Sequence, residues 1–253
     1  MPENRIFARN REGKKAQVMQ LIWPSTELVE LAAIAGFDGV DIDGEHGAFS
    51  PLDIDLVCRT AQGFGMTVTA RVPSVDPVAI NVYLARGVQG IQGPHIETAE
   101  QAQLLADSCM FPPDGERSWG PGRGTEYGHE PNIKNLHGGN VEYMRDANAN
   151  IYIYGQIESR KGVENLDEIL KVKHLHAIAY GANDMASSLG HPGEPNHPDV
   201  KAAHADIEKR VRAAGKHLMT DRFTPLRVST FLLDKLMDYT KQHANDAATV
   251  DGA

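Results

Sequence analysis

Short apolar, β-prone runs alternate with amphipathic stretches along most of the chain. An apolar run of this kind predicts a buried strand, and apolar residues at helical spacing predict a helix. The pattern predicts seven strands, at 17–23, 39–42, 67–72, 90–95, 151–154, 177–180 and 216–220. It predicts helices at 2–12, 25–35, 51–63, 77–86, 98–109, 161–171, 199–214 and 228–243.

Strands that alternate with helices favour an α/β fold in which crossover helices join a parallel sheet. A length of 253 residues suits one (β/α)8 TIM-type barrel or two small domains, and we expect one barrel domain spanning 1–253. No eighth strand is evident, because few residues separate the seventh strand from the last helix. We expect either a truncated barrel or a short substitute strand such as 221–224.

Two segments depart from the alternation. The stretch 111–150 is rich in Gly, Pro, Asn and Arg, and we predict a long loop insertion there. A structureless loop of this length is uncommon inside a compact domain and usually serves function or forms an interface. The tail 244–253 is small and polar, and we expect it to be frayed.

Charge and composition restrict the partners. The formal net charge of −9 argues against nucleic acid, since binding to its backbone needs clustered Lys and Arg. No apolar run is long enough to span a membrane, and the N-terminal stretch lacks the apolar core of a signal peptide. Cys58 and Cys109 are far apart and lie in helical patterns. We therefore expect free thiols and a reducing, cytoplasmic location.

Candidate chemistry lies where the predicted strands end. In α/β barrels the active site is built at the carboxyl ends of the strands. Glu158, in the segment Gly-Gln-Ile-Glu-Ser at 155–159, stands where a buried strand gives way to a helix. Such a carboxylate can instead simply favour the helix N-terminus. Three further strand ends carry ionisable groups, which favours the functional interpretation.

Two of these strand ends carry a histidine and an arginine. His46 follows the second strand in Asp-Gly-Glu-His, and a carboxylate such as Asp43 can hold the tautomer of an imidazole and raise its basicity. A polar loop is the alternative, and Glu45 could point away from both. Arg71 ends an otherwise apolar strand and therefore needs an anion. That anion is either a buried carboxylate, of Asp43 or Glu158, or a bound carboxylate or enolate.

Glu158 and Asp184 end consecutive strands and could bind the same ion. Two carboxylates with waters and a bidentate substrate suit Mg²⁺, Mn²⁺ or Co²⁺. Zinc fits less well, because no histidine or cysteine cluster accompanies them. Helix capping is the alternative for Asp184. The backbone N–H groups of Gly181 and Ala182 could bind a substrate carboxylate.

Three other side chains also end strands. We expect His95 and Gln156 to line or support the cavity, with Gln156 close to the substrate, and Trp23 to form an apolar wall for the substrate. The chain lacks the nucleophile elbow of hydrolases, the Walker loop of nucleotide-binding proteins and a dinucleotide-binding fingerprint after a strand.

Four short motifs at the strand ends resemble those of a known family. They are Asp-Gly-Glu-His at 43–46, Ala-Arg-Val-Pro at 70–73, Gln-Ile-Glu at 156–158 and Gly-Ala-Asn-Asp at 181–184. Phe-Pro-Pro at 111–113, followed by Arg117, is also similar. Over roughly 17–215 the chain resembles the HpcH/HpaI family of class II, metal-dependent pyruvate aldolases, which includes 2-keto-3-deoxy sugar acid aldolases and macrophomate synthase.

The resemblance implies a barrel of the phosphoenolpyruvate/pyruvate type and a reaction. The reaction is the reversible cleavage of a 4-hydroxy-2-oxo acid to pyruvate and an aldehyde, through an enolate stabilised by Mg²⁺, Mn²⁺ or Co²⁺. The implied roles are metal ligands for Glu158 and Asp184, base for His46, orientation of that base for Asp43, enolate stabilisation for Arg71 and a place beside the metal for Gln156. The resemblance also implies a homo-oligomer, typically a hexamer with helices exchanged between subunits.

Two positions depart from the family pattern. Ala182 stands where the family often has proline. Ala85 and Arg86 stand where an aspartate often precedes the glycine that ends a helix, and that aspartate serves a neighbouring subunit's site. Alternatives remain a lyase of another C–C bond, of the oxaloacetate decarboxylase or citramalyl type, and an inactive barrel that acts as a binding subunit.

Overall fold

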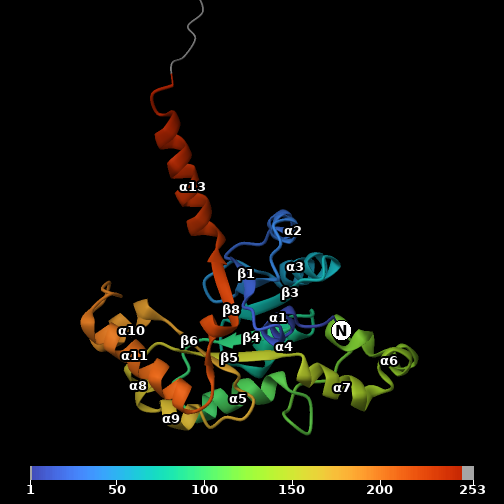
Figure 1. The fold of residues 1–253 in the computed structure, drawn as a ribbon. Coiled ribbons are helices and arrows are strands. Elements are labelled where there is room, and N and C mark those ends of the chain that lie inside the picture. The colour runs from blue at the N-terminus through green and yellow to red at the C-terminus, as the bar shows by residue number, and fades with distance from the viewer. Residues whose placement is uncertain (1, 247–253) are drawn as a thin grey trace, which may run out of the picture.

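A computed structural model of the protein describes residues 2–246, and its centre is one curled sheet of eight parallel strands flanked by helices (Figure 1). The hydrogen-bonded order is β7-β6-β5-β4-β3-β2-β1-β8. The strands are β1 (Ala16–Leu21), β2 (Gly39–Asp43), β3 (Thr67–Arg71), β4 (Gly90–Gly93), β5 (Tyr152–Ile157), β6 (Ala177–Tyr180), β7 (His217–Leu218) and β8 (Phe223–Arg227). This is the α/β barrel-type architecture that the alternation predicts.

Helices join successive strands, with α1 before β1 and α13 after β8. They are α1 (Arg5–Arg11), α2 (Thr26–Ile34), α3 (Pro51–Gly63), α4 (Pro77–Leu84), α5 (Ala99–Cys109), α6 (Glu130–His137), α7 (Asn140–Ala149), α8 (Arg160–Glu164), α9 (Leu166–Ile169), α10 (Ala182–Leu189), α11 (Pro198–Ala213), α12 (Met219–Arg222) and α13 (Val228–His243), with a 3-10 segment η1 (Arg123–Gly128).

An eighth strand exists, so the truncated barrel, one of our two expectations, is wrong. The other, a short substitute strand near 221–224, is confirmed in β8 at Phe223–Arg227. β8 pairs in parallel with β1, with Phe223 opposite Ala16 and Arg227 opposite Gln20. The four-residue α12 replaces the crossover helix that normally joins two parallel strands. β7 is only two residues long, and within residues 2–246 it does not hydrogen-bond to β8. The ring of strands is therefore open between β7 and β8.

Local sequence signals set the helix starts on the site side of the sheet. The Ser50 hydroxyl accepts a hydrogen bond from the backbone N–H of Asp53, the Asp53 carboxylate accepts one from the backbone N–H of Ser50, and Pro51 opens α3. The side chain of Thr98 caps α5 in the same reciprocal way with Gln101. Such capping boxes satisfy N–H groups that a helix end leaves without partners. Each helix consequently starts directly after the loop that carries the strand-end residues.

Side chains on the two faces of the strands form separate clusters. Outward-facing residues such as Ile42 and Val68 pack under the helices in the main core. Inward-facing residues fill the barrel, where Tyr152 and Tyr154 of β5 meet Phe223 of β8. Ile6 of α1 belongs to the same inner cluster. The amino-terminal end of the barrel is thus packed with apolar side chains, which leaves the carboxyl end for chemistry.

The stretch 111–150 is not the long loop that its composition predicts. It contains η1, α6 and α7. The two helices pack Ile133, Tyr143 and Ala147 with Phe111 into a small core of their own. Burial of this apolar surface stabilises helices whose composition alone favours turns.

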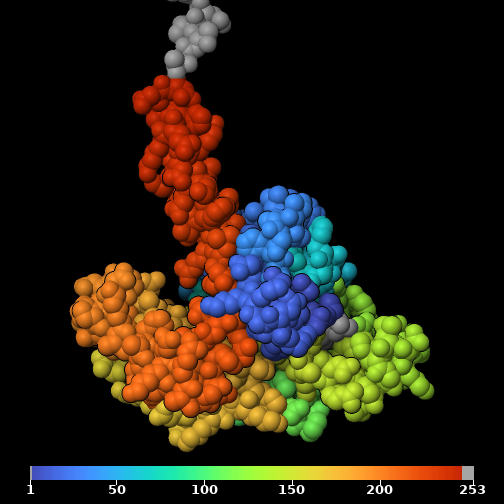
Figure 2. Space-filling view, in the orientation of Figure 1, coloured from blue at the N-terminus to red at the C-terminus, as the bar shows by residue number. Residues whose placement is uncertain are grey.

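The last helix stands away from the rest of the molecule. Figure 1 shows α13 extending beyond the barrel, and Figure 2 shows it as a separate column of atoms. Val228 is its only buried residue within the described part of the chain. The frayed tail that we expect at 244–253 falls mostly outside the described residues. Within 2–246 no helix has both the length and the apolarity to cross a membrane.

Both cysteines are free thiols, as expected, and both are buried, Cys58 in α3 and Cys109 in α5. Burial raises the pKa of each thiol to about 12. Neither therefore offers a reactive thiolate near neutral pH.

Candidate active site

The sheet register brings three polar side chains to one edge. Asp43, the last residue of β2, pairs with Arg71, the last residue of β3, and Arg71 pairs with Gln92 of β4. Side chains at paired positions of a parallel sheet lie on the same face. The carboxyl end of the barrel therefore collects a carboxylate, a guanidinium and an amide from three consecutive strands.

Arg71 is held by two carboxylates. Its Nε donates to Asp43 Oδ1 at 3.1 Å and one terminal nitrogen donates to Asp43 Oδ2 at 2.5 Å. The other terminal nitrogen lies 2.8 Å from Glu45 Oε2. Burial acts to raise the pKa of Asp43, but it is outweighed by the hydrogen bonds from Arg71 and from the His46 backbone together with nearby positive charge, so that the pKa lies below its usual value. The guanidinium is therefore fixed as a cation at the edge of the barrel.

Asp43 holds the backbone of His46 and not its imidazole. Asp43 Oδ1 accepts hydrogen bonds from the backbone N–H groups of Glu45 and His46, both at 3.2 Å. The imidazole is 65% exposed, and its Nε2 lies 3.9 Å from Glu45 Oε2. Our expectation that Asp43 orients the ring directly is thus corrected: Asp43 shapes the turn that presents the ring to solvent.

Glu158 is the most deeply buried carboxylate of this edge. Its residue is 2% exposed, and its Oε1 accepts a hydrogen bond from the backbone of His95 at 2.9 Å. Its Oε2 accepts one from Gln156 Nε2, while Gln156 Oε1 accepts one from Gln92. Burial raises the pKa of Glu158, and the negative charge of Asp184 raises it further, against the hydrogen bonds from His95 and Gln156.

The donor set fits a divalent cation. Asp184 is exposed in the first turn of α10, close enough for its charge to act on Glu158. A positive ion between the two carboxylates would relieve the repulsion by which Asp184 raises the pKa of Glu158. Gly181, the residue before α10, provides no side-chain cap, so the start of α10 offers backbone N–H groups toward the same edge.

Gly181 lies against the Glu158 carboxylate. A Cβ at position 181 would lie 2.2 Å from Glu158 Oε2 and 2.7 Å from Gln156 Nε2. We therefore expect Gly181→Ala to displace Glu158 and to weaken Mn²⁺ binding by about 10- to 100-fold, the size of effect typical for groups that orient a ligand. Equilibrium dialysis with Mn²⁺ measures this. Gly63→Ala is the control, since a Cβ at position 63 meets nothing within 4 Å, and equal affinities in the two variants would contradict the prediction.

His95 links two acidic groups whose connection the sequence does not reveal. Its Nδ1 lies 3.1 Å from Glu158 Oε1 and its Nε2 lies 2.9 Å from Glu45 Oε1. His95 has a φ of 48°, a backbone conformation rare for residues other than glycine. A continuous chain of polar contacts therefore runs from Arg71 through Glu45 and His95 to Glu158.

Sequence reasoning missed Gln92 and Asp41 and assigned no role to Glu45. Asp41 precedes Asp43 by two residues on β2, so both side chains face the barrel interior. Thr69 Oγ1 donates to Asp41 at 2.6 Å, and Gln20 donates to it at 3.3 Å. The two-residue spacing was a usable signal for Asp41. No comparable signal identified Gln92.

Burial raises the pKa of Asp41 to about 6 from 3.8. The folded state therefore binds this proton more tightly than the unfolded state, and stability falls as the pH rises from about 4 to about 6. A shift of about two units corresponds to about 3 kcal/mol. As the pH rises from 4 to 7, we expect the free energy of unfolding of Asp41→Asn to increase by about that much relative to that of the wild type. Urea unfolding at several pH values tests this, with Asp55→Asn on α3 as control. If the free energy of unfolding of Asp41→Asn changed with pH in parallel with that of the wild type, the prediction would be contradicted.

Two expected substrate-contacting residues are less closely tied to this cluster. Trp23 lies in the turn after β1 and is 37% exposed. Within residues 2–246 no hydrogen bond connects its indole to the strand-end cluster. Ala182 is the first residue of α10 and half-buried. The structure therefore brings together Asp43, Glu45, Arg71, His95, Gln156 and Glu158 most tightly.

Comparison with known proteins places the chain in a family. The family model of HpcH/HpaI aldolase/citrate lyase matches residues 20–231. The 4-hydroxy-2-oxovalerate aldolase of Rhodococcus jostii (strain RHA1) is 36% identical over 191 residues, which cover 74% of this chain and 69% of the relative. The pyruvate aldolase of Rhizobium etli is 33% identical over 220 residues, covering 85% of this chain and 82% of the relative.

Solved structures share the fold. An HpcH/HpaI aldolase/citrate lyase family protein from Burkholderia cenocepacia J2315 aligns with a TM-score of 0.82 at 24% identity, covering 96% of this chain and all of that one (100%). Macrophomate synthase aligns with a TM-score of 0.76 at 24% identity, covering 98% and 92%. The family match spans most of the chain, including every strand-end motif discussed above. The chain belongs to the HpcH/HpaI aldolase/citrate lyase family of enzymes.

Proposed function

We propose that the protein is a class II aldolase that reversibly cleaves a 4-hydroxy-2-oxo acid to pyruvate and an aldehyde. The observation that carries the proposal is the Arg71 guanidinium, fixed by Asp43 and Glu45 and linked through His95 to the buried Glu158. A fixed cation beside a candidate metal centre suits an anionic 2-oxo acid and the enolate derived from it. The named aldolase relatives support the same reaction class.

Glu158 and Asp184 would hold the divalent cation, with Mg²⁺, Mn²⁺ and Co²⁺ as candidates for the oxygen donors. When bound, such an ion supplies Lewis-acid polarisation of the keto oxygen, which acidifies the adjacent methyl group. The hydrogen bond from Gln156 fixes the position of one Glu158 carboxylate oxygen. The N–H groups at the start of α10 are suited to the substrate carboxylate.

The chain's own groups would handle the proton and the negative charge. The exposed His46 imidazole is free to accept the methyl proton, since Asp43 engages only the backbone at this position. Arg71 stabilises negative charge on the enolate oxygen as it forms. Trp23 would form an apolar wall at the mouth of the site. In the cleavage direction the same groups act in reverse order.

Exchange of deuterium from solvent into the methyl group of pyruvate tests the proposal. We expect this exchange, monitored by NMR, to depend on added Mn²⁺ and to be lost in His46→Asn. The control is His204→Asn, an exposed histidine of α11 stacked on Tyr180, which should exchange normally. Exchange that continues in a chelated sample, or in His46→Asn, would contradict the mechanism.

We further propose a homo-oligomer, a hexamer by family resemblance, in a reducing cytoplasm. The exposed apolar residues of α13 support the first point: they are Phe231, Leu232, Leu233, Leu236, Met237 and Tyr239. A helix with this much uncovered apolar surface usually packs against another chain. Its separation from the barrel in Figure 2 suits packing on a second copy.

Substitution on α13 tests this assembly. We expect the double variant Leu233→Glu/Leu236→Glu to have a smaller mass in light scattering than the wild type, because burying two carboxylates in an apolar interface is unfavourable. Lys235→Glu changes the charge at an exposed polar position of the same helix and serves as control. An unchanged mass in the double variant would contradict the proposed role of α13.

A further inference from the structure

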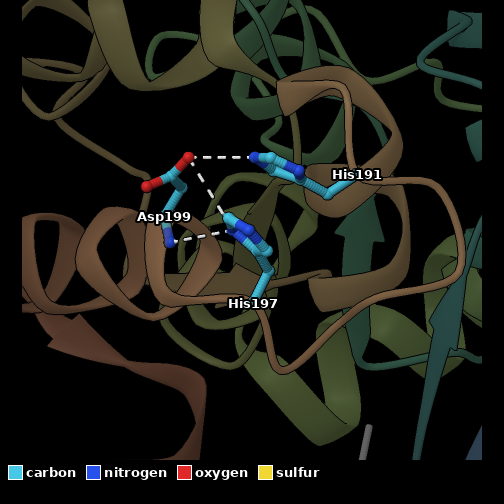
Figure 3. A group of neighbouring side chains, drawn as sticks. All are labelled: His191, His197 and Asp199. Atoms are coloured by element: carbon cyan, nitrogen blue, oxygen red, sulfur yellow. Dashed lines mark hydrogen bonds and ion pairs between the residues drawn. The ribbon is translucent and has the colours of Figure 1, made fainter.

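Two histidines and an aspartate converge on the connection between α10 and α11 (Figure 3). His191 Nε2 lies 2.9 Å from Asp199 Oδ2, and His197 Nδ1 lies 3.7 Å from the same oxygen. One ligand atom from each residue lies within 4.8 Å of the other two. The two imidazole rings stack with centroids 3.4 Å apart. This cluster is separate from the strand-end site and has no role in the proposed reaction.

Backbone turns bring these residues together. His191 N donates to Ala186 O at 2.8 Å as α10 ends, Glu194 N donates to His191 O at 3.0 Å, and His197 N donates to Glu194 O at 2.9 Å. Gly190 and Gly193 adopt positive φ, a conformation that glycine tolerates at low cost. The chain therefore folds back so that His197 meets His191 before α11 begins. The arrangement is ordered by main-chain hydrogen bonds and not only by the side chains.

The spacing of the ligand atoms suits a tetrahedral cation once the two imidazole rings turn out of their stack, because a metal ion lies in the plane of each imidazole that binds it. Zn²⁺ bound at about 2.0 to 2.1 Å places its ligand atoms about 3.3 Å apart in a tetrahedron. The two separations from Asp199 Oδ2, 2.9 Å and 3.7 Å, lie on either side of that value. Two imidazoles and a carboxylate are donors typical of zinc, and partial exposure of both histidines leaves room for a water as fourth ligand. Mg²⁺ and Ca²⁺ prefer oxygen ligands.

We propose that His191, His197 and Asp199 bind a Zn²⁺-class cation that fastens the end of α10 to the start of α11. The cation replaces the hydrogen bond between His191 and Asp199, and the contact of His197 Nδ1 with the Asp199 backbone. Because α10 begins with the residues next to Glu158, the site fixes the far end of a helix that contributes to the active site. Its role is structural and is independent of the aldolase reaction.

Helix capping alone does not account for the cluster. His197 Nδ1 accepts a hydrogen bond from Asp199 N at 3.2 Å, as a cap of α11. His129 Nδ1 caps α6 in the same way, accepting from Asn132 N at 3.2 Å. Within the described residues His129 belongs to no such metal-ligand group. His129 is therefore a matched control for the capping function without the second imidazole.

Zinc stoichiometry tests the proposal in full-length protein without a histidine tag. Equilibrium dialysis with Zn²⁺, followed by elemental analysis, should give one equivalent fewer in His191→Gln than in wild type, and no change in His129→Gln. In Glu158→Gln protein, whose candidate active-site metal ligand is removed, one equivalent that depends on His191 should remain. The measurement in Glu158→Gln protein separates a failure of the present proposal from a failure of the proposed active site.

Co²⁺ reports the geometry directly. We expect the intense visible absorption of tetrahedral Co²⁺ in Glu158→Gln protein, and its loss when His191→Gln or Asp199→Asn is added. Circular dichroism checks that these partly exposed substitutions leave the fold intact. Zinc content and a Co²⁺ spectrum unchanged by His191→Gln, or the absence of any cation bound in Glu158→Gln protein, would overturn the proposal.

Discussion

Glu158→Gln should abolish measurable metal-dependent exchange of the pyruvate methyl protons. A neutral amide replaces the buried carboxylate that receives hydrogen bonds from His95 and Gln156, so the charge that attracts the cation is lost. Because a group that merely orients a ligand is worth about 10- to 100-fold in metal affinity, loss of the ligand itself should weaken Mn²⁺ binding by at least about 100-fold. Mn²⁺ paramagnetic resonance measures binding, and NMR of pyruvate measures exchange.

The controls separate this effect from a change in fold. Glu164→Gln, on the exposed surface of α8, should bind Mn²⁺ as the wild type does. Asp184→Asn removes the second carboxylate at an exposed position and should give the same loss without altering a buried group. Normal Mn²⁺ affinity in Glu158→Gln would show that the metal centre lies elsewhere and would remove the basis of the proposed reaction.

The alternation of apolar runs predicted seven strands in nearly correct places, but it gave β8 only as one of two alternatives, a short substitute strand at 221–224, for a physical reason. Its sequence, Phe-Thr-Pro-Leu-Arg at 223–227, contains Pro225, which lacks the N–H group that a central strand needs. Within residues 2–246, β8 is an edge strand that pairs with β1 alone, and a missing donor is tolerated there. The short α12 also removes the helix that normally signals a following strand.

The helices within 111–150 were missed because composition there favours turns. Their stability comes from contacts that local sequence does not display. Tyr143 packs against Trp119 and His137, and its hydroxyl donates to Gly124 O at 2.9 Å. Arg117 stacks its guanidinium over the ring of Phe111. Such long-range packing overrides weak local propensity.

The site was predictable to the extent that strand ends could be found. The expected positions of Arg71, Gln156 and Glu158 follow from parallel strands ending at one edge. The partners of each side chain were not predictable, because they depend on turn geometry. The Asp43 carboxylate accepts two backbone N–H groups in its own turn, and this directs Glu45 toward Arg71. The spacing from Asp43 to His46 therefore suggested a contact with the imidazole that the turn does not make.

Arg71→Lys should lower the metal-dependent exchange rate by about 10²- to 10³-fold, the effect typical of removing one fixed donor to a developing oxyanion. Lysine keeps the positive charge but is a point charge without a planar fork. It cannot donate to both oxygens of Asp43 and also reach Glu45, as Arg71 does. We therefore expect affinity for Mn²⁺ to be retained while the exchange rate falls, as measured by NMR at saturating Mn²⁺ and pyruvate.

Lysine is the informative substitution, because Arg71→Ala would leave Asp43 buried without its cation, at a cost of about 3 to 5 kcal/mol in stability. A loss of activity in that variant could simply reflect unfolding. Arg59→Lys on α3 is the control, since Arg59 forms an exposed ion pair with Asp55, and its exchange rate should match the wild type. If Arg71→Lys exchanged at the wild-type rate, Arg71 would serve only as the counter-ion of Asp43. Enolate stabilisation would then have to come from other groups at this edge of the barrel.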